Sequence, residues 1–210
     1  MLYPDARILL FAKAPEPGRV KTRLVPALSV EAAAGLYARM LDHTVAMTID
    51  AAIAPLECSC APDARHPFFQ HLAQRYALML SSQAGADLGE RMANAARGHL
   101  AGGVPVVLIG GDVPALRPRH LIEALRQLHA GSDAVVAPAE DGGYVMLALR
   151  RFDHSLFTDM AWGSDSVLAV TRQRLAALGW RWQETETLWD LDRAADLSRL
   201  EPHQLRWLSG

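Results

Sequence analysis

Short apolar runs alternate with stretches of helical spacing along nearly the whole chain, and this alternation constrains the fold more than any other feature. The clearest run, "PVVLIGG" at 105–111, is typical of a strand buried on both faces of a sheet. Helices must then cover both faces, so the sequence predicts an α/β fold with a mostly parallel open sheet. The 210 residues contain no linker, repeat or low-complexity segment, which predicts one domain over residues 1–210.

The other runs and patterns give the order of the elements. Strands are predicted at 7–12, 56–61, 76–81, 105–111, 133–138, 144–149 and 181–186. Helices are predicted at 30–52, near 66–75, at 87–101, from Pro118 to near Gly131, and at 165–178 behind Ser164, with short helical segments toward the C-terminus.

Composition excludes several classes of protein. Lys and Arg total 21 against 23 for Asp and Glu, so bulk charge does not indicate a nucleic-acid partner. No apolar run reaches the ~18 residues that span a bilayer, and Asp5 and Arg7 interrupt any signal-peptide profile. Cys58 and Cys60 are expected to be buried thiols, pointing to opposite faces of one strand. These features predict a cytoplasmic protein without a transmembrane segment.

A cluster of positive charge follows the first predicted strand. The stretch "FAKAPEPGRVKTRL" carries two prolines, one glycine and four cations, Lys13, Arg19, Lys21 and Arg23. In open α/β sheets, ligands bind outside the carboxyl ends of the strands, where this loop lies. Lys and Arg neutralise phosphate, and Gly18 would let the backbone approach it, so the loop indicates a nucleotide site. The alternative is an ordinary solvated charged surface.

Three acidic turns follow later strands. They are "GGDVPAL" at 110–116, "EDGG" at 140–143 and "WDLD" at 189–192. Carboxylates repel phosphate but can hold Mg²⁺ or Mn²⁺, which bridges to it. Asp112 is therefore predicted as one metal ligand and Asp190 or Asp192 as the second, with the choice between them open. Each turn also has a structural alternative, such as a hairpin at the glycines or a helix cap at Asp192.

Other catalytic motifs are absent from the sequence. "GRVKT" differs from a phosphate-binding P-loop because Val20 stands where the pattern needs glycine. No G-x-G-x-x-G follows the first strand, and no G-x-S-x-G elbow exists, which weakens a hydrolase interpretation.

Six motifs occur in an order that resembles a known family. They are "FAKAPEPGRVKTRL", "DLGERM" (87–92), "GGDVPAL", "EDGGYVMLAL" (140–149), "WGSDSVLAVT" (162–171) and "WDLDRAADL" (189–197). Together they resemble a bacterial family of glycosyltransferase-like proteins, often described as uncharacterised. The chain is more remotely similar to the molybdenum-cofactor and 2-phospho-L-lactate guanylyltransferases. The resemblance implies the nucleotide-diphospho-sugar transferase fold, also called glycosyltransferase type A.

The resemblance also implies roles for particular residues. Lys13, Gly18, Arg19, Lys21 and Arg23 would bind the nucleotide phosphates, and Asp87, Gly89 and Arg91 would lie near the base or ribose. Asp112 would be the metal-binding aspartate, and Asp190 or Asp192 the second ligand of Mg²⁺ or Mn²⁺. Relatives often read "DIDT" in the last motif, where this chain has Arg193 in place of Thr. A single aspartate stands where glycosyltransferases commonly have D-x-D.

These observations predict a metal-dependent transferase that uses a nucleotide donor and a small-molecule acceptor. Transfer of a sugar from a nucleotide-diphospho-sugar is preferred, with Lys21, Asp112 and Asp141 as catalytic residues and Asp141 as the general base. The alternatives are nucleotidyl transfer, which releases pyrophosphate, and a nucleotide-binding protein without turnover. Four cations suit a triphosphate, which favours nucleotidyl transfer.

The acceptor and the base cannot be identified from the sequence. Residues 150–163 are expected to border the acceptor pocket, with Phe157 and Trp162 either stacking on the acceptor or packing in the core. All five tryptophans lie from Trp162 onward. They would form a homodimer interface or close the core, and core packing is preferred.

Overall fold

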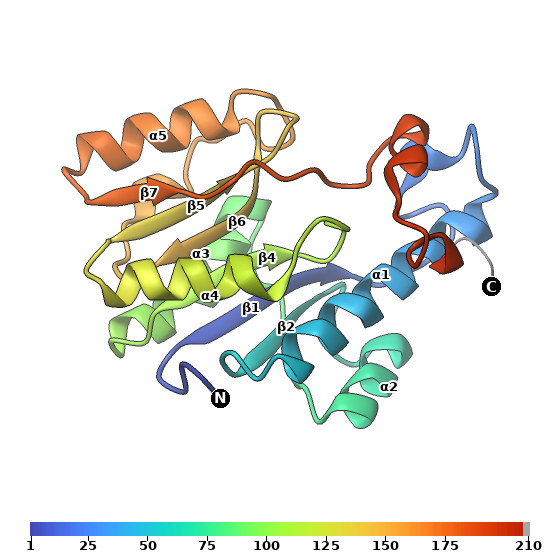
Figure 1. Ribbon diagram of the computed structural model, residues 1–210, viewed down its shortest axis with the longest axis horizontal. Coiled ribbons are helices and arrows are strands. Elements are labelled where there is room, and N and C mark those ends of the chain that lie inside the picture. Colours follow the sequence, from blue (N-terminus) through green and yellow to red (C-terminus); the bar gives the residue numbers. More distant parts are fainter. Residues whose placement is uncertain (208–210) are drawn as a thin grey trace.

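The computed structural model describes residues 1–207, which form one seven-stranded sheet flanked by helices (Figure 1). The strand order is β3-β2-β1-β4-β6-β5-β7. The strands are β1 (Arg7–Lys13), β2 (Leu56–Ala61), β3 (Met79–Ser82), β4 (Val106–Gly110), β5 (Ala134–Pro138), β6 (Tyr144–Leu149) and β7 (Trp182–Glu184). Only β6 runs antiparallel to its neighbours, β4 and β5, so the predicted mostly parallel α/β sheet is confirmed.

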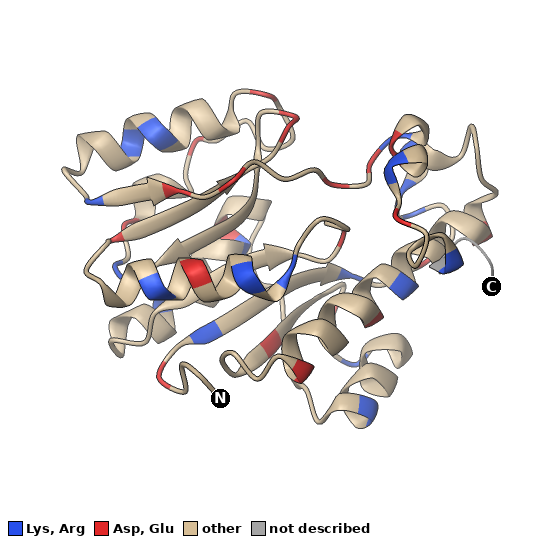
Figure 2. Ribbon diagram, in the orientation of Figure 1, with Lys and Arg blue, Asp and Glu red and all other residues tan. Residues whose placement is uncertain are grey.

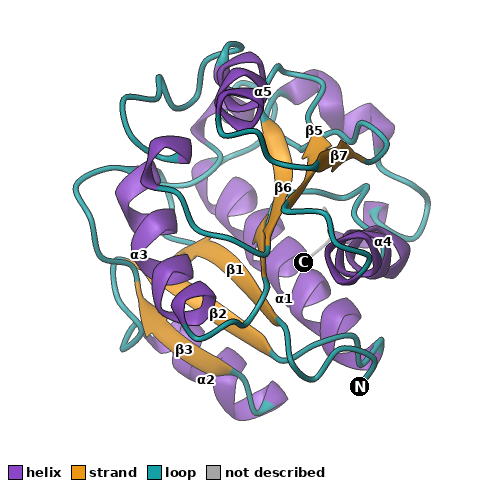
Figure 3. Ribbon diagram, turned by 90° about the vertical axis from the view of Figure 1, so that its left-hand side faces the viewer, coloured by secondary structure: helices purple, strands orange, loops and turns teal. Residues whose placement is uncertain are grey.

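Within residues 1–207, five α-helices cover the two faces of the sheet (Figure 3). They are α1 (Val30–Asp50), α2 (Pro67–Tyr76), α3 (Leu88–Ala101), α4 (Pro118–His129) and α5 (Val167–Ala177). Short 3-10 segments lie at Thr22–Leu24, His154–Leu156, Ala194–Arg199 and Leu205–Trp207. One core cluster joins α1, α2 and α4 to the sheet, and a second joins α3 and α5 to its other face. Strands buried from both sides account for the uninterrupted apolar runs of the sequence.

Most predicted elements are present, with shifted ends. Strands 56–61 and 144–149 have the predicted bounds. The strand predicted from residue 76 begins at Met79, because α2 continues to Tyr76 and Ala77 ends it in the left-handed conformation. The helix predicted behind Ser164 begins only at Val167.

The expectation for the two cysteines is wrong in its geometry. Side chains two residues apart on a strand lie on the same face, and the Sγ atoms of Cys58 and Cys60 are 3.7 Å apart. Both thiols are free and fully buried in the cluster under α1 and α2. Burial therefore agrees with the prediction, whereas opposite orientation does not.

The chain beyond β7 crosses the carboxyl edge of the sheet and reaches the N-terminal part of α1 (Figure 1). We call residues 185–204 the strap. Leu188 N donates to Pro138 O at 2.9 Å, and Leu191 N donates to Asp112 O at 3.0 Å. Leu191 and Leu200 then pack in a third buried cluster with residues of α1 and Leu24. The strap thus ties together the loops that follow β1, β4 and β5.

Four of the tryptophans pack within the chain. Trp180 is buried in the cluster under α3 and α5, where Trp162 and Trp182 also pack, and Trp189 packs against the third cluster. The side chain of Trp207 lies outside the described part of the structure. Core packing is thus observed for the four, while a homodimer stays a prediction. Among residues 1–207, no helix has the length and apolar character needed to cross a membrane.

Gly89 provides a test of how the loop before α5 packs on α3. A Cβ atom at Gly89 would collide with the carbonyl oxygen of Phe157 and lie 2.8 Å from Trp162 Nε1. We expect Gly89→Ala to lower the stability by about 1–3 kcal/mol in thermal unfolding, as overpacking does. Gly98→Ala on the same helix meets nothing within 4 Å and should raise stability by about 1 kcal/mol. Equal effects of the two changes would contradict this packing.

Candidate functional site

A cleft of about 760 Å³ lies at the carboxyl ends of the strands, where the loops after β1, β3 and β4 meet the strap. It brings together ten of the charged residues singled out in the sequence: Lys13, Arg19, Lys21, Arg23, Asp87, Arg91, Asp112, Asp141, Asp190 and Asp192. Figure 2 shows the basic loop and the acidic strap close together at the right of the view. Gly18 and Gly89 do not line the cleft, because Gly18 is exposed on the loop and Gly89 is buried behind Phe157 and Trp162.

Lys21 is the cation most firmly placed in the cleft. Its Nζ lies 2.8 Å from Asp112 Oδ2, and its side chain is only 6% exposed. The backbone of Lys21 is left-handed, with φ of 49°, which is uncommon for a residue with a side chain. The structure therefore holds Lys21 in a costly conformation that aims its ammonium group at the turn after β4.

The other cations of the loop are more open to solvent. Arg23 Nη1 lies 2.7 Å from Asp192 Oδ2, and Arg19 pairs with Glu16 at 3.2 Å. Their side chains are 63% and 78% exposed, so these pairs add little to stability. Both guanidinium groups can exchange their carboxylate partners for a ligand at low cost.

Asp190 is the most perturbed acid of the cleft. Burial, followed by the negative charge of Asp112, raises its pKa to about 6, while Lys21 acts in the opposite direction. Asp141 adds a further repulsive contribution. The strap thus holds a half-buried carboxylate beside another one, an arrangement that a bound cation would relieve.

The carboxylates of the cleft fit a hard divalent cation that also takes ligands from a substrate. Asp112 and Asp190 supply the oxygen atoms that Mg²⁺ or Mn²⁺ prefers. Asp192 is already bound to Arg23. Among residues 1–207, no group of three His, Cys, Asp or Glu residues is assembled that could hold a metal by itself. Mg²⁺ commonly uses one or two carboxylates together with substrate phosphates, which matches this donor set.

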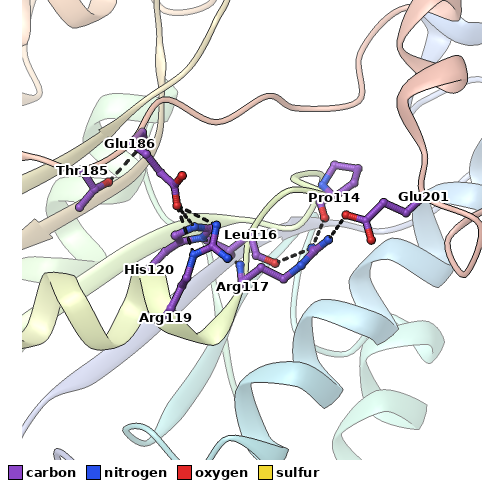
Figure 4. Close-up of polar contacts among 8 residues, drawn as sticks. All are labelled: Pro114, Leu116, Arg117, Arg119, His120, Thr185, Glu186 and Glu201. Carbon is purple, nitrogen blue, oxygen red and sulfur yellow. Dashed lines mark hydrogen bonds and ion pairs between the residues drawn. The ribbon is translucent and has the colours of Figure 1, made fainter.

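A polar network outside the cleft fixes the strap to α4 (Figure 4). Glu186 Oε1 accepts from Arg119 Nη2 at 2.9 Å and lies 2.6 Å from His120 Nε2. His120 is buried, and its Nδ1 accepts from Arg117 N at 2.9 Å, so Nε2 carries the proton donated to Glu186. Arg117 also pairs with Glu201 at 2.7 Å. The network braces the two ends of the segment that carries Asp190.

Sequence reasoning missed the residues that support the cleft from the sheet and helices. The hydroxyl of Tyr37, on α1, accepts from Lys13 N at 3.2 Å, and burial raises its pKa. Gln83 follows β3 as the basic loop follows β1, so the strand-end rule would have identified it. Tyr37 gave no such signal, because it falls within the helical spacing of core residues.

Asp190 gives the protein a pH-dependent stability. An acid whose pKa is higher in the folded than in the unfolded state makes stability fall as pH rises, here between about 4 and about 6. We expect Asp190→Asn to raise the melting temperature at pH 7.5 by a few degrees, because ~1 kcal/mol corresponds to about 2–4 °C. At pH 4 the gain should vanish. Asp192→Asn, which loses the Arg23 pair, should bring no gain; a similar gain at both pH values would contradict the assignment.

Hydrogen exchange in the strap tests the brace, which is the polar network of Glu186 with Arg119 and His120 and of Arg117 with Glu201. Glu186→Ala leaves the buried His120 Nε2–H without its acceptor, which costs about 1 kcal/mol. We expect amide exchange over residues 187–194 to become about fivefold faster. Glu184→Ala on β7, which instead removes a pair with Arg172 of α5, should leave this exchange unchanged. Slow exchange in both variants would show that the brace does not hold the strap.

Several solved structures are similar to this protein in fold, and one of them is also similar in sequence. A crystal structure from Desulfovibrio desulfuricans G20, provisionally designated a nucleotide-diphospho-sugar transferase, is 31% identical, with a TM-score of 0.82 over 90% of this chain and 83% of that one. A CMP:2-keto-3-deoxy-manno-octonic acid synthetase complexed with CTP shares 14% identity, with a TM-score of 0.59 over 96% and 98% of the chains. A nucleotidyl transfer enzyme from a Methanothermobacter species shares 16%, with a TM-score of 0.60 over the same shares.

These likenesses confirm the nucleotide-diphospho-sugar transferase fold that the motifs predicted. No curated protein sequence matches the chain. One family model matches residues 44–164, more than half of the sequence. The protein therefore belongs to the family described as uncharacterised proteins conserved in bacteria, DUF2064.

Proposed function

We propose that the protein is a transferase that takes its transferred group from a nucleotide donor bound by its phosphates in the cleft. The observation that carries the proposal is the opposition of a cationic loop and a carboxylate cluster, joined by Lys21 and Asp112 at 2.8 Å. Dense negative charge on the donor matches the loop, and hard oxygen ligands match a phosphate-bound cation. The transferase names of the proteins with this fold support the same class of reaction.

The residues of the loop bind and orient the donor. Lys21, Arg19 and Arg23 neutralise phosphate oxygens, with the two arginines able to bind them in bidentate fashion. Arg91 lines the cleft from α3 and donates from Nε to Gly85 O at 3.1 Å, which holds its guanidinium group in place there. Fixed donors of this kind contribute mainly by positioning the reactants and stabilising developing charge.

Asp112 and Asp190 would hold Mg²⁺ or Mn²⁺ together with the donor phosphates. Bound there, the cation supplies Lewis-acid stabilisation of negative charge on the phosphate leaving group. Asp190 is favoured over Asp192 as the second ligand because the charge of Asp112 acts on it directly, whereas Asp192 pairs with Arg23.

Transfer of a sugar is the first candidate reaction, in keeping with the designation of the relative at 31% identity. Asp141 lies at the cleft with its Oδ1 accepting from Gly143 N at 2.9 Å, and its second oxygen can accept a proton from an acceptor hydroxyl. Nucleotidyl transfer is the second candidate. The observation that favours it is the number of cations at the cleft, which suits a triphosphate.

A product assay separates the two reactions. The protein would be incubated with Mg²⁺ or Mn²⁺, a panel of nucleoside triphosphates and nucleotide sugars, and a set of small acceptors that carry hydroxyl or phosphate groups. Release of nucleoside diphosphate identifies sugar transfer, and release of pyrophosphate identifies nucleotidyl transfer. Binding without either product leaves only nucleotide binding, and absence of nucleotide binding rejects the proposal.

Lys21 and Asp112 should be required for turnover. We expect Lys21→Ala and Asp112→Asn each to lower the rate about 100-fold or more, the usual loss when one fixed electrostatic group is removed. Arg65→Ala is the control, because Arg65 is 90% exposed and pairs with Asp63 away from the cleft. Melting curves establish that each variant is folded. Full turnover in both variants would show that neither Lys21 nor Asp112 belongs to the catalytic site.

A further inference from the structure

A separate cavity lies between the strap and the start of α4, and it shares no lining residue with the cleft. We call it the strap cavity. Its volume of about 310 Å³ is at the lower end of the range that takes small molecules. Arg117 and Arg119 line one wall, and Trp189, Arg199 and Glu201 of the strap line the other. Because the walls come from two distant segments, the cavity exists only while the strap lies on the turn before α4.

Positive charge is in excess in the strap cavity. Within residues 1–207 it is lined by three arginines, Arg117, Arg119 and Arg199, against two carboxylates, Glu186 and Glu201. Arg117 and Arg119 also stand at the N-terminal end of α4, where the helix dipole adds to the positive potential. A concave site with this balance of charge attracts anions.

The carboxylates that pair with the arginines of α4 are exposed. Arg117 reaches Glu201 at 2.7 Å, and Arg119 reaches Glu186 at 2.9 Å (Figure 4). The side chains of the two glutamates are 54% and 53% exposed, so these pairs contribute little to stability. An anion with more than one negative charge can therefore replace them at little cost.

Arginine donors remain unused on both walls of the strap cavity. The two Nη atoms of Arg199 donate to Glu140 at 2.7 Å, and its guanidinium carbon lies 4.5 Å from the centre of the Trp189 ring. That cation–π contact holds the guanidinium group at the strap. In the described residues, neither Nε of Arg199 nor Nη1 of Arg119 makes a hydrogen bond. Each can still donate to a ligand.

We propose that the strap cavity binds a small anion that carries two or more phosphate or carboxylate charges. Arg119 would hold it from α4 and Arg199 from the strap, with Arg117 as a third cation. Guanidinium groups bind both kinds of oxyanion in bidentate fashion, so the two ligand types share this chemistry. The site does not depend on the proposed function, because none of its residues lines the cleft.

A bound anion would act on the cleft through the strap. Trp189 lines the strap cavity, whereas the next residue, Asp190, lines the cleft. Leu191 N then donates to Asp112 O at 3.0 Å. An anion that joins the two walls favours the strap in its present position, and by linkage it favours the present arrangement of the two aspartates. The ligand is therefore a regulator of the cleft.

A simpler alternative is that the arginines only brace the strap. The glutamates would then be permanent partners, and loss of one would not increase affinity for any anion. In the proposal, Glu201 competes with the ligand for Arg117, so removal of its charge strengthens anion binding. The two roles differ in the sign of this effect.

The experiment is a calorimetric titration of the full chain with inorganic pyrophosphate or citrate, without added metal. We expect binding of at least one probe, and the tighter one identifies a phosphate or a carboxylate ligand. The double variant Arg119→Gln, Arg199→Gln should lose about tenfold or more in affinity, as expected when hydrogen bonds to a charged group are removed. Arg172→Gln removes a comparable exposed pair on α5 and is the control, which should bind like the wild type.

Two single variants place the anion and keep the test valid if the double variant unfolds. Lys21→Ala should keep the binding, because Lys21 belongs to the cleft. Glu201→Gln should raise the affinity about two- to fivefold, the value of an exposed ion pair. Melting curves establish that each variant is folded.

Hydrogen exchange on the wild type gives a readout that needs no variant. Opening of the strap would separate the two walls and release the anion. At about ten times the dissociation constant, amide exchange over residues 187–194 should therefore slow about tenfold. Unchanged exchange in the presence of a bound anion would contradict the proposed bridge between the walls.

The other outcomes also decide the question. If neither probe binds the wild type, the inference is overturned, whereas the proposed function, which concerns nucleotides in the cleft, is unaffected. Binding that is lost in Lys21→Ala but kept in the double variant assigns the anion to the cleft alone and overturns the inference. Unchanged or weaker binding in Glu201→Gln shows that the arginines only brace the strap.

Discussion

The ion pair between Lys21 and Asp112 is the contact on which the arrangement of the cleft depends. It joins the loop after β1 to the turn after β4, and the lysine side chain is almost fully buried. A buried charge that loses its partner is costly, so each group holds the other in place. The strap completes the arrangement, because Leu191 N donates to the carbonyl oxygen of Asp112 itself. Displacement of this one pair would therefore be felt in three segments that are far apart in the sequence.

Several unfavourable features of the structure belong to residues that line the same cleft. Lys21 is left-handed, Asp190 has a raised pKa, and two side chains lining the cleft, Tyr144 and Trp162, have buried polar atoms without partners. Elsewhere the acids are stabilised, as at Glu123, where hydrogen bonds from Arg126 and Gln127 lower the pKa to about 2. A left-handed lysine, an acid with a raised pKa and unpartnered buried polar atoms in one cleft are typical of a binding or catalytic site, which is the physical support for the proposed function.

The strand-end rule explains why much of this site was predictable from sequence. Apolar runs fixed the strands, and Lys21, Asp112 and Asp190 each follow one, so their meeting at one edge follows from parallel topology. Gly89 has a packing role that depends on the loop at Phe157, a contact no local pattern encodes. The brace at Glu186 is equally invisible, because its partners on α4 lie more than 60 residues away. The predicted orientation of Cys58 and Cys60 was wrong for a different reason. Side chains on a strand alternate with a period of two residues, so positions two apart share a face.

On the proposed function, the Lys21–Asp112 pair makes binding of the anion and of the cation depend on each other. Lys21 neutralises a phosphate less well while its charge is paired with Asp112, and Asp112 attracts a cation less strongly while it is bound to the lysine. A cation at Asp112 releases Lys21 toward phosphate, and a phosphate on Lys21 releases Asp112 toward the cation, so each ligand favours the other by the same free energy. Positive and negative charge then remain balanced in the cleft both without and with ligands. This balance accounts for four cations on one short loop of a chain whose net charge is only -2.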